Sequence, residues 1–162
     1  MLLLSITIFY TGLHQVIWNG VHTTCVGLTV DFGDNRKSIA ALGGVFFGIG
    51  EVIGGIIFGF IGGITARKGR EPIIIIGFVT SGVAYFLMFL NLPPASPIRE
   101  TLPGETGYLD TPSTGLVLFT GFLLGFSDSC FVTQVQHLTW EGIVKLNSLN
   151  LGLCHTCWIF RR

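Results

Sequence analysis

The chain has 162 residues, of which 49% are hydrophobic and only 11% are charged. Its formal net charge is zero, and its mean hydropathy is +0.69. Ordinary soluble domains contain about 25% charged residues, so this composition argues against a soluble globular protein. The neutral charge gives no reason to expect nucleic acid as a partner, and the lipid bilayer is the expected environment.

Four long segments contain almost no charged residues: 1–30, 38–66, 72–98 and 111–140. Glu51 and Asp128 are the exceptions. A helix needs about 20 mostly apolar residues to cross a bilayer, and the segments lack the alternation of outer-membrane barrel strands. The sequence therefore predicts an all-α multi-pass membrane protein. We place four transmembrane helices at about 2–28, 39–65, 72–92 and 115–137, followed by a divergent tail at 138–162.

The first segment differs from a signal peptide. It has no basic leader, and its apolar stretch exceeds the roughly 7–15 residues of a signal core. It begins abruptly, with Leu2 directly after Met1. We read it as a transmembrane helix, and the abrupt start predicts a fragment or an alternative start.

Charges in the short connections predict the orientation. The segment 67–71 contains Arg67, Lys68 and Arg70, and Lys and Arg concentrate on the cytoplasmic side of membrane proteins. We therefore expect 67–71 and both chain ends in the cytosol. The connections 31–37 and 93–114 then face outward.

The second predicted span is rich in glycine at spacings of four. Such spacing places small residues on one helix face and lets another backbone approach closely. We predict that Gly44, Gly48, Gly55 and Gly59 form a helix-packing face. Two roles remain open for it: plain packing, or a helix that slides against its neighbour during a transport cycle.

Polar residues lie at mid-membrane depth in three of the four spans. The candidates for a cavity or proton-coupling site are Glu51, Asp128, His14, Gln15 and Gln134. A charged group at the bilayer centre costs about 2.5–3.5 kcal/mol on insertion scales, so it normally faces a cavity or a partner. Midplane polar groups bind solute or coupling ion in secondary transporters. The alternative is an interhelical hydrogen bond that fixes packing.

The preference between a functional site and a packing role differs from residue to residue. The two roles are balanced for Glu51, whereas the packing role is favoured for His14. For Asp128 a site is favoured, because Ser127, Ser129, Thr133 and Gln134 add polar groups around it. The third span offers only Thr80, Ser81 and Tyr85, so we expect it to face lipid.

No pattern of catalytic residues is evident. The histidines and acids lack an accompanying nucleophile or metal-ligand spacing. Cys154 and Cys157 form one Cys-x-x-Cys pair, which we attribute to chance because no second pair accompanies it. We therefore predict no enzyme, no catalytic residues, no metal and no cofactor.

The connection between the second and third spans resembles the loop signature of the major facilitator superfamily. Gly62, Arg67, Gly69 and Arg70 match that signature, which is part of a cytoplasmic gate in the family. Ala66 stands where the family has an acid and Glu71 where it has a base. The resemblance thus implies a gate loop at these four residues, without the usual charge relay.

Longer stretches, at 3–13, 46–55 and 123–134, are similar to helices of the Unc-93-like branch of this superfamily. His14 stands where that branch has an acid and Val132 where it has Asn. The resemblance covers about 2–136. It implies an incomplete major-facilitator-type bundle, with the four spans as the seventh to tenth of twelve.

This resemblance implies part of a solute transmembrane transporter that is inactive as a fragment. Its expected partners are the missing half of the transporter or other membrane proteins. The alternative is a non-transporting membrane adaptor or trafficking partner, which would act through a contact surface. A third interpretation is a small regulatory fragment that pairs with the full-length protein.

Overall fold

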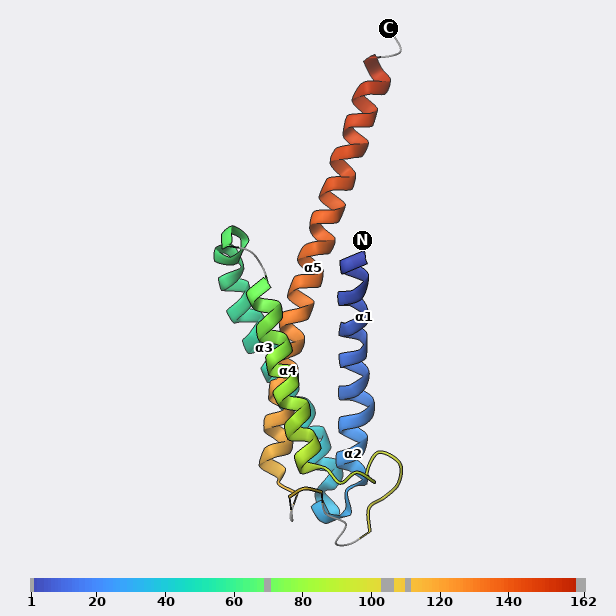
Figure 1. The fold of residues 1–162 in the computed structure, drawn as a ribbon, viewed down its shortest axis with the longest axis vertical. Coiled ribbons are helices and arrows are strands. Elements are labelled where there is room, and N and C mark those ends of the chain that lie inside the picture. Colours follow the sequence, from blue (N-terminus) through green and yellow to red (C-terminus); the bar gives the residue numbers. More distant parts are fainter. Residues whose placement is uncertain (1, 69–70, 103–106, 110–111, 160–162) are drawn as a thin grey trace.

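The computed structural model describes residues 2–68, 71–102, 107–109 and 112–159. It describes the side chains in these ranges except those of 2–4, 6–7, 61–68, 71, 137–138 and 141–159. The elements are α1 (Leu2–Val16), a π-helical turn η1 (Ile17–His22), α2 (Thr23–Leu28), a 3-10 helix η2 (Val30–Asn35), α3 (Arg36–Lys68), α4 (Glu71–Asn91) and α5 (Thr114–Ile159). They form an elongated bundle (Figure 1).

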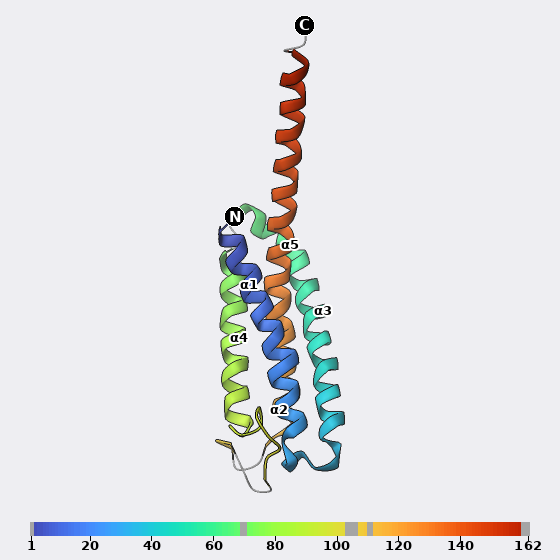
Figure 2. The same cartoon turned by 90° about the vertical axis from the view of Figure 1, so that its right-hand side faces the viewer.

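Helices α1 and α2 form one continuous rod through the π-helical turn (Figure 2). Val16 and Thr23, which flank the turn, both have a φ of −64°. The rod ends at Thr29, whose ψ of 107° is extended. At 1.5 Å per residue the rod from Leu2 to Leu28 is about 40 Å long, which exceeds the ~30 Å hydrocarbon core of a bilayer.

Within the described residues, three helices are long and apolar enough to cross a membrane. They are Val30–Phe60, Pro72–Asn91 and Thr114–Gln136. These correspond to the second, third and fourth predicted spans. The first predicted span is not among the three, because the π-helical turn divides it and α1 alone has 15 residues.

Helix α5 extends far past the predicted end of the fourth span at residue 137. It has 46 residues, or about 69 Å at 1.5 Å per residue, and its last turns project beyond the other helices (Figure 1). The tail was predicted only as divergent, and the structure shows that it continues the helix as far as Ile159.

Helix α5 is the centre of the bundle. It packs against α3, α4 and α1, while α2 packs against α3. One buried apolar cluster joins η1, α3, α4 and α5 through Trp18, Phe47, Ala84 and Leu124. The rings of Trp18 and Phe47 stack with centroids 4.5 Å apart.

Hydrogen bonds tie the connections together at the end of the bundle opposite the N-terminus. The buried Asn91 donates from Nδ2 to the Ser113 carbonyl and accepts from the Ser113 amide through Oδ1. Thr101 donates its amide to the Leu28 carbonyl at 3.1 Å. These bonds link the end of α4 to the start of α5, and the long connection to α2.

Glycines let the backbones of α3 and α5 meet. A Cβ added at Gly50 would collide with the Phe122 carbonyl oxygen, and one added at Gly54 would collide with the Ser129 side chain. On α5, a Cβ added at Gly125 would collide with the carbonyl oxygen of Phe47. Only glycine permits this approach, as in other small-residue helix contacts in membranes.

The predicted packing face is different from this contact. A Cβ added at Gly44, Gly48, Gly55 or Gly59 would meet no atom within 4 Å. Within the described residues, Gly50 and Gly54 approach α5 and the four predicted glycines contact no other helix, so their role as a packing face stays a prediction. Both sets recur at helical spacing, so spacing alone could not tell which face has a neighbour.

We predict that Gly54→Ala destabilises the protein by about 1–3 kcal/mol, the usual cost of overpacking. Gly55→Ala and Gly59→Ala are matched controls on the same helix. They should be neutral or stabilising, because alanine is favoured over glycine in a helix by about 0.5–1 kcal/mol. Thermal unfolding in detergent, followed by circular dichroism, would measure the difference. Equal stability of all three variants would contradict the assigned contact.

The positions of the helix ends make the predicted orientation in the membrane testable. The start of α1, the end of α3 and the start of α4 lie at one end of the bundle, and the end of α4 and the start of α5 lie at the other (Figure 1). We predict that the first end is cytosolic, because it holds the basic 67–71 segment. The orientation can be tested with single cysteines that replace Gly69 or Ile98 in a cysteine-free background. Ile98 is 87% exposed.

An impermeant maleimide added to intact cells that display the protein at their surface should label position 98. Position 69 should react only after permeabilisation. The reverse pattern would overturn the orientation.

Candidate functional site

Asp128 is the buried acid of α5, and it is held by α1. It is 1% exposed, and its Oδ2 accepts a hydrogen bond of 2.8 Å from Nε2 of Gln15. The Oε1 of Gln15 in turn accepts from Nδ2 of Asn19 at 3.2 Å. This chain of bonds fixes the amide so that its nitrogen faces the acid.

One oxygen of this carboxyl group remains unpaired. Among the buried side-chain polar atoms described, Oδ1 of Asp128 has no hydrogen-bond partner. A buried polar atom left unsatisfied costs about 1–3 kcal/mol, so such an atom in a native protein calls for an explanation. The missing donor can come from a protonated carboxyl group, such as that of the neighbouring Glu51, or from a ligand.

Glu51 brings a second carboxyl group to the same place. It is half-buried on α3, directly after Gly50, which contacts the backbone of α5. The Glu51 and Asp128 side chains interact with each other. The structure thus brings together Gln15, Glu51 and Asp128, three of the predicted site residues, and we call these three the carboxyl site.

No Lys or Arg residue lies near the carboxyl site along the helices that form it. Lys37 precedes Glu51 by 14 positions, Arg67 follows Glu51 by 16, and Lys145 follows Asp128 by 17. At 1.5 Å per residue each is about 20 Å or more away along its helix. The carboxyl groups therefore have no neutralising partner on their own helices.

His14 is not part of the carboxyl site. It is 1% exposed, and its Nε2 bonds to the Leu124 carbonyl at 3.1 Å. A carbonyl only accepts, so Nε2 carries the proton, and in the neutral ring Nδ1 accepts from the Tyr85 hydroxyl. With both ring nitrogens bonded, His14 links α1 to α4 and α5.

The third span was expected to face lipid, and the structure shows that its inner side also makes polar contacts with α1. Ser81 is buried and bonds to the Tyr10 hydroxyl at 3.0 Å, one turn from the Tyr85–His14 bond. Large apolar residues on the opposite side of α4, including Ile76, Val79, Val83 and Phe86, are exposed. The outer side therefore suits lipid, while the inner side anchors α1. The sequence contained a signal for these bonds that was missed. Two polar residues lie four positions apart on each span: Tyr10 and His14 on the first, and Ser81 and Tyr85 on the third.

The polar neighbours of Asp128 bond elsewhere. Ser127 donates to the Gly77 carbonyl of α4 at 3.0 Å, whereas Ser129 and Thr133 donate to carbonyls of their own helix. Gln134 is 4% exposed and lies six positions beyond Asp128, about 9 Å along the helix. Fewer polar side chains therefore belong to the site around Asp128 than the sequence suggested.

The structure does not describe the side chains of the predicted gate loop. Gly69 and Arg70 lie outside the described residues, and Gly62 and Arg67 lie on α3 where side chains are not described. Among the described residues, no three His, Cys, Asp or Glu side chains are grouped to hold a metal ion.

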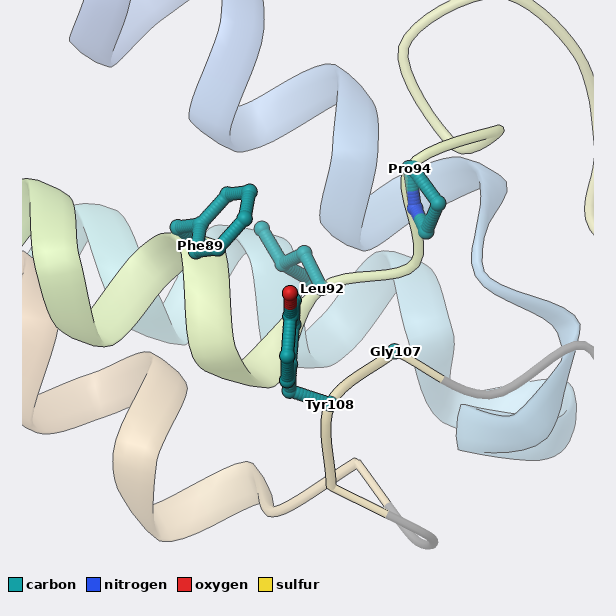
Figure 3. A pocket seen from close by; sticks show the side chains of 5 residues that line it. All are labelled: Phe89, Leu92, Pro94, Gly107 and Tyr108. Carbon is teal, nitrogen blue, oxygen red and sulfur yellow. The ribbon is translucent and has the colours of Figure 1, made fainter.

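Two apolar pockets lie apart from the carboxyl site. One, of about 280 Å³, is lined by Phe89, Leu92, Pro94, Gly107 and Tyr108. Figure 3 shows Phe89 and Leu92 at the end of α4 beside the Tyr108 ring. A second pocket of similar size borders it between α2 and α4. Among the described residues that line the two pockets, none is charged and none belongs to the carboxyl site.

A sequence model of the family described as "Ion channel regulatory protein UNC-93" matches residues 1–147 of the chain. The chain belongs to the UNC-93 family. The match extends about ten residues past residue 136, where the resemblance was expected to end. With three candidate membrane spans, this family assignment makes the chain a multi-pass membrane protein.

Two curated relatives show how much of a longer protein the match covers. UNC93-like protein MFSD11 of Xenopus laevis is 41% identical over 135 residues, which are 83% of this chain and 30% of that protein. The protein of the same name from Xenopus tropicalis is 39% identical over the same length. The chain therefore spans about 30% of the length of these relatives. No solved structure matches it.

We predict that His14 stabilises the bundle instead of binding a ligand. His14→Phe should remove the bonds to the Leu124 carbonyl and the Tyr85 hydroxyl and lower the free energy of unfolding by about 1–3 kcal/mol. Tyr85→Phe removes one partner and should cost less. The double variant should show coupling between the two positions. Unfolding in detergent would measure these effects, and an unchanged stability of His14→Phe would contradict the assignment.

Proposed function

We propose that this chain is part of an UNC-93-family solute transporter, and that the carboxyl site forms one wall of its solute or coupling-ion site. The observation that carries the proposal is Asp128, fully buried by α1 and α5 and left with one oxygen unpaired.

The position of the carboxyl site supports this proposal. Gln15, Glu51 and Asp128 lie on three different helices, each near the middle of its apolar stretch. Ionisable groups inside a membrane are costly and are retained mainly where they act on solutes, ions or protons. Sites in secondary transporters are built near the bilayer midplane from several helices in this way.

The resemblance to major facilitators suggests how the chain would fit into a larger protein. We propose that its spans correspond to the seventh to tenth of twelve. Alternating access requires two halves that rock around a shared site. By itself, the chain would therefore lack the opposite wall and would not transport, unless the missing half or another membrane protein joined it.

A graft would test the transport role. The residues of this chain can replace the matched 135-residue region of the Xenopus laevis relative, and solute uptake by cells or proteoliposomes can be screened over a broad panel. We predict uptake above that of empty controls, and at least a tenfold loss with Asp128→Asn. We also predict that the reconstituted chain alone gives no saturable uptake.

Controls separate the site from general damage. Asp34→Asn makes the same chemical change at an exposed position near the membrane surface and should leave uptake unchanged. Surface expression and thermal stability of each graft should be measured in parallel. Undiminished uptake by a folded Asp128→Asn graft, or Asp128-dependent uptake by the chain alone, would refute the corresponding part of the proposal.

A second candidate is a non-transporting adaptor or regulator of other membrane proteins. The description of the family as ion channel regulatory favours it, as does the open side of α3 at Gly44, Gly48, Gly55 and Gly59. In this case Gly55→Leu in the graft would abolish co-purification of a partner channel, whereas Asp128→Asn would leave it intact. The reverse result would favour the transporter.

A further inference from the structure

The carboxyl groups of Glu51 and Asp128, which we call the acid pair, are close enough to share a hydrogen bond. An ionised carboxylate only accepts hydrogen bonds, whereas a protonated carboxyl group has one O–H donor. A hydrogen bond between two acids therefore needs a proton on one of them. Two ionised groups in the same positions would instead repel each other, and the repulsion is strong in a low-dielectric surrounding.

The side chains around the acid pair do not replace this proton. The amide nitrogen of Gln15 bonds to Oδ2 of Asp128, and Oδ1 of this buried side chain has no donor. The nearest Lys and Arg residues along the helices of the site are about 20 Å away or more. A proton therefore supplies both the donor and the positive charge that the pair lacks.

Other titratable groups near Asp128 are engaged elsewhere. His14 of α1 bonds through Nε2 to a carbonyl of α5, and it accepts through Nδ1 from the Tyr85 hydroxyl of α4. Cys130 of α5 donates its thiol hydrogen to a carbonyl of its own helix. The titratable side chain that α3 presents to Asp128 is Glu51 itself. A proton at this place therefore belongs to the acid pair.

We propose that the acid pair binds one proton, shared between Glu51 and Asp128, and that this proton is the coupling ion of the transporter. The first statement concerns the chain itself, whereas the second rests on the proposed transport function. With the proton bound, the pair carries one negative charge instead of two. The O–H group of Glu51 is then the donor that the unpaired Oδ1 of Asp128 lacks.

A proton fits the acid pair better than a metal ion does. Among the described residues, no three His, Cys, Asp or Glu side chains are grouped to hold a metal ion, and calcium takes roughly six to eight oxygen ligands. The described residues that line the two pockets include neither acid. A proton between two oxygens needs no cavity and no further ligand.

Glu51 gives the proton its route to water. Asp128 is 1% exposed, whereas Glu51 is half-buried. At 3.6 residues per turn, Gly48 and Gly55 lie within about 60° of Glu51 around α3, and a Cβ added at either glycine would meet no atom within 4 Å. The proton therefore enters and leaves the pair from the α3 side.

Proton release is coupled to the contact between α3 and α5. Release transfers the proton to water and leaves two carboxylates, which disfavour each other at short distance. Gly50 and Gly54 hold the two helices together, so the acids stay side by side while this contact is closed. The doubly charged state therefore favours an opened contact, which connects proton binding to a movement of α3 against α5.

Infrared spectroscopy of the whole chain in lipid nanodiscs tests for the bound proton. A protonated carboxyl group has a carbonyl stretch that ionised carboxylates lack, and we expect this band at neutral pH. Asp128→Asn and Glu51→Gln should each abolish the band. In either variant the new amide donates in place of the proton, and the remaining acid ionises.

Matched controls change exposed carboxyl groups. Asp34→Asn and Glu100→Gln should leave the band unchanged. If Asp128→Asn fails to fold by circular dichroism, Glu51→Gln decides the matter, because Glu51 is only half-buried. Absence of the band from the folded original chain, or its persistence in folded Glu51→Gln, would overturn the inference. Saturable binding of radiolabelled sodium that needs both acids, without the band, would overturn it in favour of a metal ion.

The result is distinguishable from the test of transport. In the graft, an inward proton gradient should accelerate uptake, and Glu51→Gln should remove the acceleration. The band without any uptake by the graft would support the bound proton and refute the transporter. Asp128-dependent uptake that is insensitive to the gradient, in a protein without the band, would support the transporter and refute the bound proton. The band together with gradient-insensitive uptake would refute the coupling role.

Discussion

The close approach of α3 to α5 is the constraint on which the rest of the structure depends. Gly50 and Gly54 leave no space for a side chain between the two backbones. Glu51 directly follows the first of these glycines, and Asp128 directly precedes Ser129, which contacts the second. The contact that packs the helices therefore also places two carboxyl groups side by side. Widening it by one methyl group would separate the helices and the acids together.

Helix α1 completes both the bundle and the carboxyl site with two adjacent residues. His14 and Gln15 differ by about 100° around the helix, so they face different neighbours. His14 bonds to α4 and α5, while Gln15 bonds to Asp128. The bonds of His14 fix the position and rotation of α1. In that position, Gln15 reaches the carboxyl group of Asp128. The residue that packs the bundle and the residue of the proposed site are thus adjacent in the chain.

The π-helical turn begins two residues after Gln15 and ends at His22. Such turns occur mostly as local interruptions of α-helices and are frequent at functional sites. Here the turn carries Trp18 into its stack with Phe47 and His22. It therefore links the helix that holds Asp128 to the packed region between α1, α3 and α5, next to the carboxyl site.

The amino-acid sequence by itself determined the membrane environment and the helical class. Long uncharged segments have few alternatives to helices in lipid, because every backbone polar group must be paired within the segment. It also pointed to Asp128, Glu51 and Gln15, because burying such groups in a bilayer is costly wherever they occur. These conclusions follow from composition and depth, which a linear sequence records directly.

Only the tertiary structure decided which helix faces meet. Glycines recur on two sides of α3, and only the contact with α5 shows that Gly50 and Gly54 are the packed ones. The bonds from Ser81 and Tyr85 to α1 depend on the rotation of α4, which periodicity leaves undefined when a helix is apolar all round. The unpaired oxygen of Asp128 is likewise a property of three helices in register. Spacing along one helix defines its faces, but the partner of each face is set by the packing of the whole bundle.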